Sequence, residues 1–389
     1  MSTKASQATR TTARPAQPRF RGLLRGSTWL VGATILASLI AVLPIIGEIV
    51  RPGHGATVAR TAFAAAGPGE YVVASRSAED ADIILVAPAG DPSAAIEVAR
   101  VAHVAGFAPT GAVSPDGRRV ALVVADGGTQ GHPSASLVLL DLDTGSLKQL
   151  ATGVEELQTA LWAPDGKSIV VSRASEGSGS LVTFTLGRVA VDGAGETVAA
   201  RFDRVLGAYP VAFDRAGRLV VVVIDARGST VYRDAAPAAT ISSQITRDWK
   251  LSPDGSRLAF IESNVTNGLH YLARVVTLDG GSGSEVAAQS ALNDEQQQLG
   301  VSWKPGSDSP TFGSEPASIA GSAGVFAQSV MAGFDIPLSY SPDGSILAVQ
   351  HWTGTSYSSP GKMTLDLTSA DGGRTPLDGF SRFFGWATR

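Results

Sequence analysis

The sequence predicts an all-β fold: a seven-bladed β-propeller closed by the C-terminal strand and preceded by one N-terminal transmembrane helix. Three observations support this prediction. A short turn phrase recurs along the chain at intervals of 37 to 52 residues. Fragments at the two ends of the repeated region complete each other. One long uncharged apolar segment lies near the N-terminus.

The clearest copy of the turn phrase is KLSPDGSRLAFI, which begins at Lys250. Ser252 suits the first position of a type I turn, Pro253 has the φ of the second, and Gly255 can take the left-handed conformation that ends the turn. An alternating apolar run follows, so the phrase is half of a β-hairpin. Other copies are AVSPDGRRVALVV from Ala112, LWAPDGKSIVVS from Leu161, SYSPDGSILAVQ from Ser339, and the degraded AFDRAGRLVVVV from Ala212 and SWKPGSDSPTF from Ser302.

The spacing of the copies is that of propeller blades. The aligned turn positions are Pro115, Pro164, Arg215, Pro253, Pro305 and Pro342. A four-stranded blade takes about 40 to 50 residues, and helical repeats carry no such turn between two β-rich runs. Several second strands are almost continuous apolar runs, which suits strands covered on both faces by neighbouring blades.

The two ends of the repeated region predict how the ring closes. Residues 71–75, 83–86 and 95–101 read as second, third and fourth strands that lack a first strand. Residues 383–388 match the first-strand phrase, with Trp386 where Trp162 and Trp303 stand in other repeats. We therefore expect the C-terminal strand to complete the N-terminal blade and bring the count to seven. The sixth blade, 298–333, is expected to be the least regular, because residues 311–324 are rich in Gly, Ser, Ala and Pro.

The N-terminal region predicts a membrane anchor. The expected domains are a basic cytoplasmic tail (1–27), a transmembrane helix (28–50), a linker (51–68) and the propeller (69–389). The stretch from Gly26 to Gly47 holds 22 residues without a charge. As a helix it spans roughly 33 Å, about the thickness of a bilayer core. Six basic residues precede it, which predicts a cytoplasmic N-terminus and an extracytoplasmic propeller.

A cleaved signal peptide is the alternative, with Ala62-Phe63-Ala64 in the form of a cleavage site. The apolar core is longer than the roughly 7–15 residues of a signal peptide, and the triplet lies far beyond its end. The sequence favours the retained anchor.

Composition narrows the classes of function. The chain has no cysteine, which excludes disulfides, thiolate metal sites and a lipid-modified cysteine. Beyond residue 27 it holds 25 lysines and arginines against 35 aspartates and glutamates. This acidic balance argues against binding nucleic acid or an anionic membrane surface.

The repeated Ser-Pro-Asp-Gly phrase resembles the WD-like repeats of the TolB-type β-propeller family, over residues 69–388. The resemblance implies the propeller fold. Propellers of this kind include periplasmic interaction modules, gating domains of prolyl-oligopeptidase-like enzymes and anchored proteins. The chain departs from the periplasmic TolB form, because only an 18-residue linker precedes the ring and no N-terminal α/β domain is evident.

Several residue patterns invite a chemical interpretation, and each has a structural one that we favour. Asp116, Asp165, Asp254 and Asp343 suggest a ring of metal ligands, but each is a local acceptor in a type I turn. Asp141-Leu142-Asp143 lacks the later Gly and Glu of a calcium loop. The five histidines show no metal-ligand spacing; they are His54, His103, His132, His270 and His351. His351, beside Trp352, either lines a binding face or is an ordinary packed or solvent-facing residue, and the ordinary role is favoured.

Patterns for catalysis and stacking are equally weak. The chain holds no Gly-x-Ser-x-Gly elbow, and Gly166-Lys167-Ser168 lacks the first glycine of a phosphate loop. One aromatic position recurs in successive repeats, as Trp162, Phe213, Trp303, Tyr340 and Trp386. A stacking platform for sugars or peptides is one interpretation, and packing between blades is favoured. The sequence therefore assigns no catalytic, cofactor-binding or metal residues and no cofactor.

The leading prediction is a non-enzymatic, membrane-tethered propeller that displays a protein- or ligand-binding surface outside the cytoplasmic membrane. Its expected partners are other envelope or membrane proteins. The alternative is a propeller enzyme of hydrolase, lyase or lactonase type, with a site built around the central channel by several blades. A third possibility is a propeller that gates a separately encoded hydrolase, which requires a large apolar patch on one face.

Overall fold

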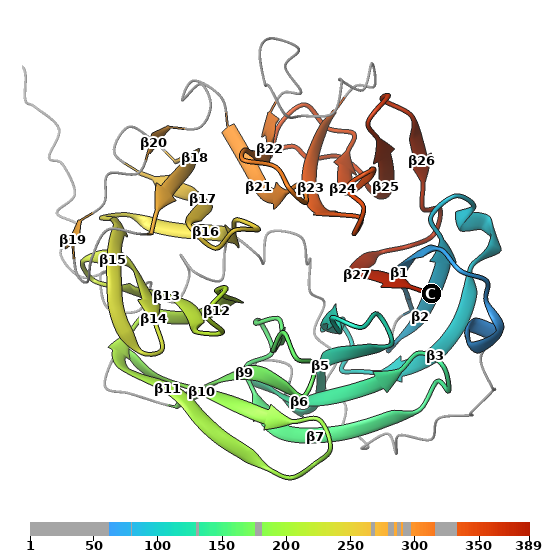
Figure 1. The fold of residues 1–389 in the computed structure, drawn as a ribbon, viewed down its shortest axis with the longest axis horizontal. Coiled ribbons are helices and arrows are strands. Elements are labelled where there is room, and N and C mark those ends of the chain that lie inside the picture. The colour runs from blue at the N-terminus through green and yellow to red at the C-terminus, as the bar shows by residue number, and fades with distance from the viewer. Residues whose placement is uncertain are drawn as a thin grey trace, which may run out of the picture. The chain divides into compact units, whose positions relative to one another are not determined.

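The computed structural model describes residues 62–389 except 79, 130–131, 176–180, 266–268, 279–283, 286–288, 291–296 and 316–332. The chain divides into two units, Met1–Ile45 and Ile46–Arg389, and the described residues all belong to the second. Within that unit the strands form antiparallel sheets arranged in a ring (Figure 1). The fold is an all-β propeller, as predicted.

Each blade is named here after its innermost strand. The β27 blade comprises β27 (Arg382–Thr388), β1 (Glu70–Ser77), β2 (Ala81–Pro88) and β3 (Ile96–Ala102). The β4 blade comprises β4 (Thr110–Val113), β5 (Arg119–Thr129), β6 (His132–Asp141) and β7 (Leu147–Val154). The β8 blade comprises β8 (Leu161–Trp162), β9 (Ser168–Ser175), β10 (Val182–Ala190) and β11 (Glu196–Val205).

The β12 blade comprises β12 (Gly207–Phe213), β13 (Leu219–Asp225), β14 (Gly228–Arg233), β15 (Ala236–Ser242) and the short parallel β19 (Ser284–Glu285). The β16 blade comprises β16 (Ile245–Leu251), β17 (Arg257–Asn264), β18 (His270–Thr277) and β20 (Gln289–Ser290). A two-stranded sheet follows, β21 (Gln297–Trp303) with β22 (Pro310–Glu315). The β23 blade comprises β23 (Phe334–Tyr340), β24 (Ile346–Trp352), β25 (Met363–Ser369) and β26 (Arg374–Pro376).

The blade count differs from the expectation of seven. Six blades of four or more strands are present among the described residues, and the expected sixth blade (298–333) contributes only β21 and β22. Strand β22 ends at Glu315, within the segment that is poor in β-branched residues, and residues 316–332 lie outside the described part of the chain.

The C-terminal strand closes the ring, as predicted. Strand β27 pairs antiparallel with β1, so that Trp386 lies opposite Val72. At the end of this ladder the main chains of Gly69 and Arg389 exchange two hydrogen bonds of 3.1 Å. The N-terminal blade thus takes its innermost strand from the last residues of the chain.

The described chain begins inside the expected linker and is already part of the propeller there. A single 3-10 turn, η1 (Ala62–Ala65), places Phe63 against Tyr71 with ring centroids 5.2 Å apart. The Arg389 guanidinium lies 4.4 Å from the centre of the Phe63 ring. Phe63 is fully buried, so the propeller core extends a few residues before position 69.

Local hydrogen bonds explain why the turn phrase recurs. The hydroxyl of Ser252 accepts the N–H of Arg257 at 2.9 Å, and the carboxylate of Asp254 accepts the N–H of Ser256 at 3.1 Å. Gly255 has a φ of 74°, the left-handed conformation that the turn requires. Equivalent bonds recur at Ser114 and Asp116 and at Ser341 and Asp343. Each aspartate therefore acts as the turn acceptor that the sequence suggests.

The recurrent aromatic residues join neighbouring blades. The indole N–H groups of Trp162 and Trp303 donate to the main-chain oxygens of Ala112 and Lys250, each at 2.9 Å. Trp386 makes the corresponding bond to Ser339 at 3.4 Å. In each case the acceptor lies two residues before the turn serine of the preceding blade. Packing between blades, rather than a stacking platform, is the role of this position.

Among the described residues, none of the helices has the length and apolar character needed to cross a bilayer. The expected transmembrane helix, 28–50, and the basic tail, 1–27, lie outside them.

Candidate binding face

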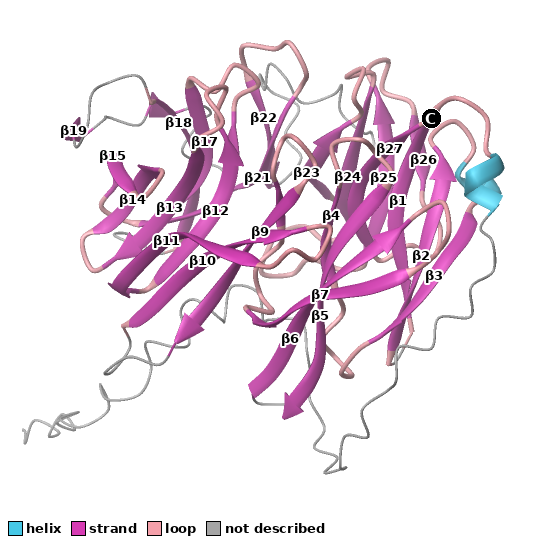
Figure 2. Ribbon diagram, turned by 60° about the horizontal axis from the view of Figure 1, so that its bottom comes forward, coloured by secondary structure: helices cyan, strands magenta, loops and turns pink. Residues whose placement is uncertain are grey.

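The ends of the strands define two faces of the ring. The turn face carries the turns between first and second strands, including 114–118 and 252–256. The crossover face carries the hairpins between second and third strands and the connections from one blade to the next, at 78–80, 103–109, 155–160, 206, 243–244, 265–269 and 353–362. In Figure 2, η1 lies near one face, and the end of β5 and the start of β6 lie near the other.

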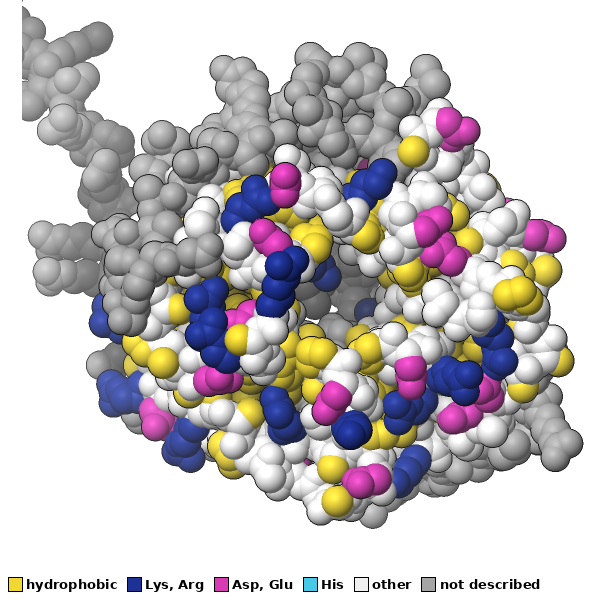
Figure 3. Space-filling view, in the orientation of Figure 1, with side chains coloured by type: hydrophobic (Ala, Val, Ile, Leu, Met, Phe, Trp, Pro, Cys, Tyr) yellow, Lys and Arg dark blue, Asp and Glu magenta, His cyan; other side chains and the backbone are white. Residues whose placement is uncertain are grey.

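The innermost strands surround a central hollow, around which charged side chains of both signs are interspersed (Figure 3). Five of these strands, β12, β16, β21, β23 and β27, carry a register shift against the second strand. In β16 the shift includes Asp248, whose φ of 55° is unusual for a residue other than glycine. Lys250 follows on the same strand. Lys250 is exposed as a whole, yet the protein around its amine removes water from it and so lowers its pKa.

Exposed apolar side chains gather on the crossover face. Within the described ranges, six large hydrophobic residues are exposed, and five of them lie in crossover-face segments with exposed fractions of 37% to 62%: Leu157, Leu206, Ile245, Val265 and Leu269. They follow one another around the ring, at the connections into β8, β12 and β16 and in the β17–β18 hairpin. The sixth, Val198, lies on the outer strand β11.

An acidic pair lies within the same face. Glu155 and Glu156 occupy the turn that connects β7 to β8, next to the exposed Leu157. Burial, followed by the neighbouring charge of Glu156, raises the pKa of Glu155 to about 7. The Glu155 N–H donates to the main-chain oxygen of Ser172 at 2.8 Å, which fixes the turn against β9. The Glu155 carboxyl therefore titrates near neutral pH.

An aromatic pair extends this site across two blades. Tyr209 of β12 and Trp249 of β16 have ring centroids 4.8 Å apart, and the charge of Glu155 helps burial to raise the pKa of Tyr209. A Cβ on Gly207 would lie 2.5 Å from the Tyr209 ring. The absence of a side chain at Gly207 thus lets the Tyr209 ring fold back over Gly207, toward the start of β12 on the crossover face.

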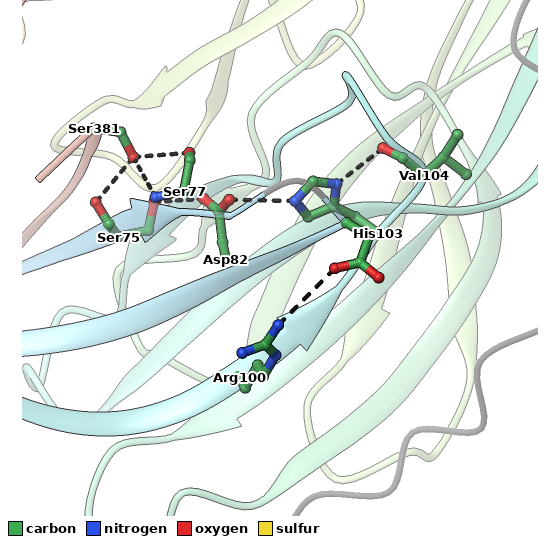
Figure 4. Close-up of polar contacts among 8 residues, drawn as sticks. Ser75, Ser77, Asp82, Arg100, His103, Val104 and Ser381 are labelled. Atoms are coloured by element: carbon green, nitrogen blue, oxygen red, sulfur yellow. Dashed lines mark hydrogen bonds and ion pairs between the residues drawn. The ribbon is translucent and has the colours of Figure 1, made fainter. Parts of the chain in front are cut away.

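A buried Ser-Asp-His group at the same end of the β27 blade has the wrong connectivity for catalysis (Figure 4). Ser75 Oγ donates to Asp82 Oδ2 at 2.6 Å, and His103 Nε2 lies 3.2 Å from Asp82 Oδ1. In a catalytic triad the histidine stands between serine and aspartate. Here the aspartate stands between the other two, so His103 cannot take the proton of Ser75.

The Asp82–His103 contact is instead a buried ion pair. His103 Nδ1 lies 2.9 Å from the main-chain oxygen of Val104, which can only accept, so Nδ1 carries a proton. Although burial opposes the charged form, the bond to Asp82 raises the pKa of His103. Burial likewise opposes ionisation of Asp82, but His103 and Ser75 lower its pKa overall. Ser381 connects this group to the C-terminal segment, because its hydroxyl accepts the N–H of Ser77 at 3.0 Å.

His351 does not line a surface. It is 3% exposed, and its Nδ1 lies 2.8 Å from Asp335 Oδ1. Arg374 binds Asp335 as well as Oδ2 of Asp366, the latter at 3.1 Å. Burial raises the pKa of Asp366 despite that partner. One polar residue from each strand of the β23 blade therefore joins a buried network, and the packed interpretation of His351 is confirmed.

The remaining candidate residues have structural roles where they are described. Asp141 ends β6 and accepts the N–H of Thr144 at 2.9 Å, as expected for a strand end followed by a turn. Lys167 donates its N–H to Asp165 at 2.9 Å within a hairpin turn. His270 is exposed, while His54 and the side chain of His132 lie outside the description. Over the described part of the chain, no group of three or more His, Asp or Glu residues is arranged to hold a metal ion.

Sequence reasoning missed the crossover face, because its residues come from connections that share no phrase. Leu206 and Ile245 border the first strands of their blades, and Glu155 lies in a connection between two blades. A signal does exist in the sequence. An apolar residue stands in the polar connection EELQ at Leu157 and again before the first strands of two later blades.

The chain resembles known proteins in its structure, but it matches none of the family models or curated proteins in sequence. Similar solved structures include TolB from Acinetobacter baumannii, with 15% identity over 83% of this chain and 67% of that one and a TM-score of 0.48. The β-propeller domain of the Trilobed protease from Pyrococcus furiosus has 15% identity over 83% and 97% of the two chains, with a TM-score of 0.47.

Prolyl oligopeptidase B from Galerina marginata has 11% identity over 82% of this chain, with a TM-score of 0.51. The chain spans about half the length of that enzyme, 51%. At such identities the likeness concerns the fold alone, and by its fold the chain is a β-propeller protein.

Proposed function

We propose that this protein is a non-enzymatic, membrane-tethered propeller that binds another protein of the cell envelope or membrane through its crossover face. The observation that carries the proposal is the distribution of exposed apolar side chains. Isolated exposed hydrophobic residues are normal on any protein surface. Here five of the six in the described chain lie on one face and follow one another around the ring. Such clustering is typical of interaction surfaces.

Affinity capture of the full-length chain from detergent-solubilised membranes tests this assignment. The test variant carries Ile245→Asp and Leu269→Asp, which place charges in the crossover face. The matched control carries Val198→Asp, which changes an apolar residue on β11 that is even more exposed than the two tested residues. We expect proteins that co-purify with the wild type and the control to be lost from the test variant. Equal recovery with all three would refute binding through this face. A hydrolase among the captured proteins would identify the propeller as its gate.

The proposed tethering rests on the apolar segment at 28–50 and on the basic residues before it. Because the chain has no cysteine, single cysteines report topology without background. Ser6→Cys should resist a membrane-impermeant maleimide in intact cells, and Thr375→Cys on the exposed strand β26 should react. Labelling of both positions, or release of the protein by an alkaline wash, would contradict a retained anchor with a cytoplasmic N-terminus.

We also propose that β21 and β22 are the inner half of a seventh blade and that the protein is a TolB-like propeller in membrane-anchored form. The support is the register of the two strands and the repeated turn phrase. Trp303 of β21 makes the same bond to the preceding blade that Trp162 makes elsewhere in the ring.

A second candidate is an enzyme with its site around the central hollow, and Lys250 favours it. An amine with a lowered pKa is a better nucleophile at neutral pH than an ordinary lysine. Trapping with an aldehyde and borohydride, followed by peptide mapping, compares Lys250 with the exposed Lys167. Preferential modification of Lys250 supports this candidate, and equal modification removes its only specific support.

A further inference from the structure

The turn between β7 and β8 carries more hydrogen-bond acceptors than the described protein satisfies. Two residues after Glu156, the amide oxygen of Gln158 is buried and accepts no hydrogen bond. The hydroxyl of Ser172, whose main chain accepts the Glu155 N–H, is likewise buried without a partner. Buried polar atoms are normally paired, so this turn is suited to receive donors from outside the chain.

A cation would supply such donors. No ion pair joins Glu155 or Glu156 to a lysine or arginine in the described part of the chain, whereas Asp225 pairs with Arg227 and Asp335 pairs with Arg374. A lysine brings three donors and an arginine five, with a positive charge that matches the acidic pair.

Apolar surface surrounds the acidic pair on the crossover face. Leu157 follows it directly, and Leu206 and Ile245 mark the next two blade connections. The Tyr209 ring contacts Trp249, and besides burial, the charge of Glu155 is close enough to raise its pKa. An aromatic ring next to carboxylates suits the aliphatic stem and the charged head of a long basic side chain.

Building on the function proposed above, we infer that the crossover face binds a polypeptide segment in which one lysine or arginine stands between apolar residues. The cation lies against the carboxylates of Glu155 and Glu156, and the flanking apolar residues lie against Leu157, Leu206 and Ile245.

Other occupants fit the face less well. An anionic lipid surface would be repelled by the acidic pair. A second copy of this chain would bring the same acidic pair to an isologous interface. The chain's own N-terminal segment joins the ring on the turn face, where Phe63 and Gly69 contact Arg389, so it starts at the opposite end of the strands.

Selection of peptides from a random displayed library, with the detergent-purified full-length protein as target, tests the inference. Selected peptides are then synthesised, and their dissociation constants are measured by fluorescence anisotropy. The variants are Glu155→Gln with Glu156→Gln, which keeps the side-chain shape, Ile245→Asp, and Val198→Asp as the control. Thermal unfolding confirms that each variant is folded.

We expect the selected peptides to share a lysine or arginine flanked by apolar residues. Replacing that residue by glutamine should weaken binding at least tenfold to the wild type and to Val198→Asp. The same replacement should have little effect on binding to the double glutamine variant, because the partner charges are already absent.

The outcomes separate this inference from the proposed function. Peptides that require Ile245 but show no preference for a cation would overturn the inference and leave the binding face intact. Failure to select any peptide, or selection of peptides indifferent to Ile245→Asp, would overturn both. Ile245-dependent sedimentation with phosphatidylglycerol vesicles would overturn it in favour of a membrane surface. An Ile245-dependent dimer in size-exclusion chromatography would overturn it in favour of a second copy.

Discussion

The indole N–H of Trp303 donates a hydrogen bond to the main-chain oxygen of Lys250, 2.9 Å away in the preceding blade. The Arg257 guanidinium of that same blade lies 5.5 Å from the centre of the indole ring. Trp162 and Arg119 repeat the arrangement between the β8 and β4 blades. A hydrogen bond and a cation–π contact thus join the rim of one blade to the inner strand of the next.

Substitution of this tryptophan should weaken the contact between blades. Trp303→Phe removes one hydrogen bond and should cost about 1 kcal/mol of unfolding free energy. Trp303→Ala also leaves a cavity and should cost about 3 to 5 kcal/mol. Urea unfolding monitored by circular dichroism measures both, with the exposed Val198→Ala as a control that should change stability by less than about 0.5 kcal/mol. If Trp303→Ala matches that control, the contact does not hold the blades together.

The buried Asp82–His103 pair should make stability depend on pH in two directions. The pKa of His103 is raised above 6.5, so its contribution is full below that pH and is lost as pH rises through the folded-state pKa. The pKa of Asp82 is lowered below 3.8, so its contribution is full above that pH and is lost as pH falls through the folded-state pKa. The pair therefore stabilises most between pH 3.8 and 6.5.

Thermal unfolding of His103→Gln across this range checks the prediction. The variant should lose most stability relative to the wild type near pH 5 to 6, and the difference should shrink at alkaline pH. His270→Gln, which changes an exposed histidine, is the matched control. A stability difference for His103→Gln that is independent of pH would mean that His103 is neutral in the folded protein.

Removal of residues 380–389 should destabilise the whole ring. The deletion takes away β27 and exposes the edge of β1, whose residues from Tyr71 to Ser75 are all buried. An exposed apolar edge promotes aggregation. Thermal unfolding should show a lower midpoint and soluble aggregates, and hydrogen exchange should accelerate in β1. An unchanged midpoint would refute closure by the C-terminal strand.

Gly207→Ala should disturb the candidate binding face from within. Its Cβ would lie 2.5 Å from the Tyr209 ring, so the ring must move away from its place over residue 207. We expect weaker binding of selected peptides and altered Trp249 fluorescence, because Tyr209 contacts the indole. Gly90→Ala, where nothing lies within 4 Å of the new Cβ, is the control and should leave both unchanged. The same fluorescence and affinity in both variants would place Tyr209 outside the binding site.

Binding of a cationic peptide should strengthen as pH rises through about 7. Glu155 titrates there in the free protein, raised by burial and by the charge of Glu156, with Tyr209 as its aromatic neighbour. A bound cation favours the ionised carboxylates, so binding releases a proton. Affinity measured from pH 5.5 to 8.5 should rise for the wild type and stay level for Glu155→Gln with Glu156→Gln. If the affinity of the wild type does not change with pH, the acidic pair takes no part in binding.

The fold was predictable wherever the same turn recurs, because the same residues are needed to form it each time. Ser252, Asp254 and Gly255 satisfy a turn by local hydrogen bonds and a positive φ, so the same residues appear in each well-formed blade. Ring closure could be predicted because Trp386 stands at the same position of its blade as Trp162 and Trp303, where the indole bonds to the preceding blade. The blade count could not be settled in this way, because residues 311–324 are rich in Gly, Ser, Ala and Pro and poor in the β-branched residues that indicate a strand.

The candidate face was not predictable, for the opposite reason. Leu157, Leu206 and Ile245 are separated by about 40 to 50 residues, which is the blade period, but they belong to connections of different lengths. The ring brings these connections to one face. Neither the pairing of Asp82 with His103 nor the folding back of Tyr209 over Gly207 has any signature in sequence spacing.

The pairing of β27 with β1 joins strands that are about 300 residues apart in the sequence. During synthesis or export, the β1 edge therefore stays open until β27 has been translated and has left the ribosome or translocon. A chain that is cut or terminated before β27 presents an unpaired apolar edge, which quality-control proteases can recognise.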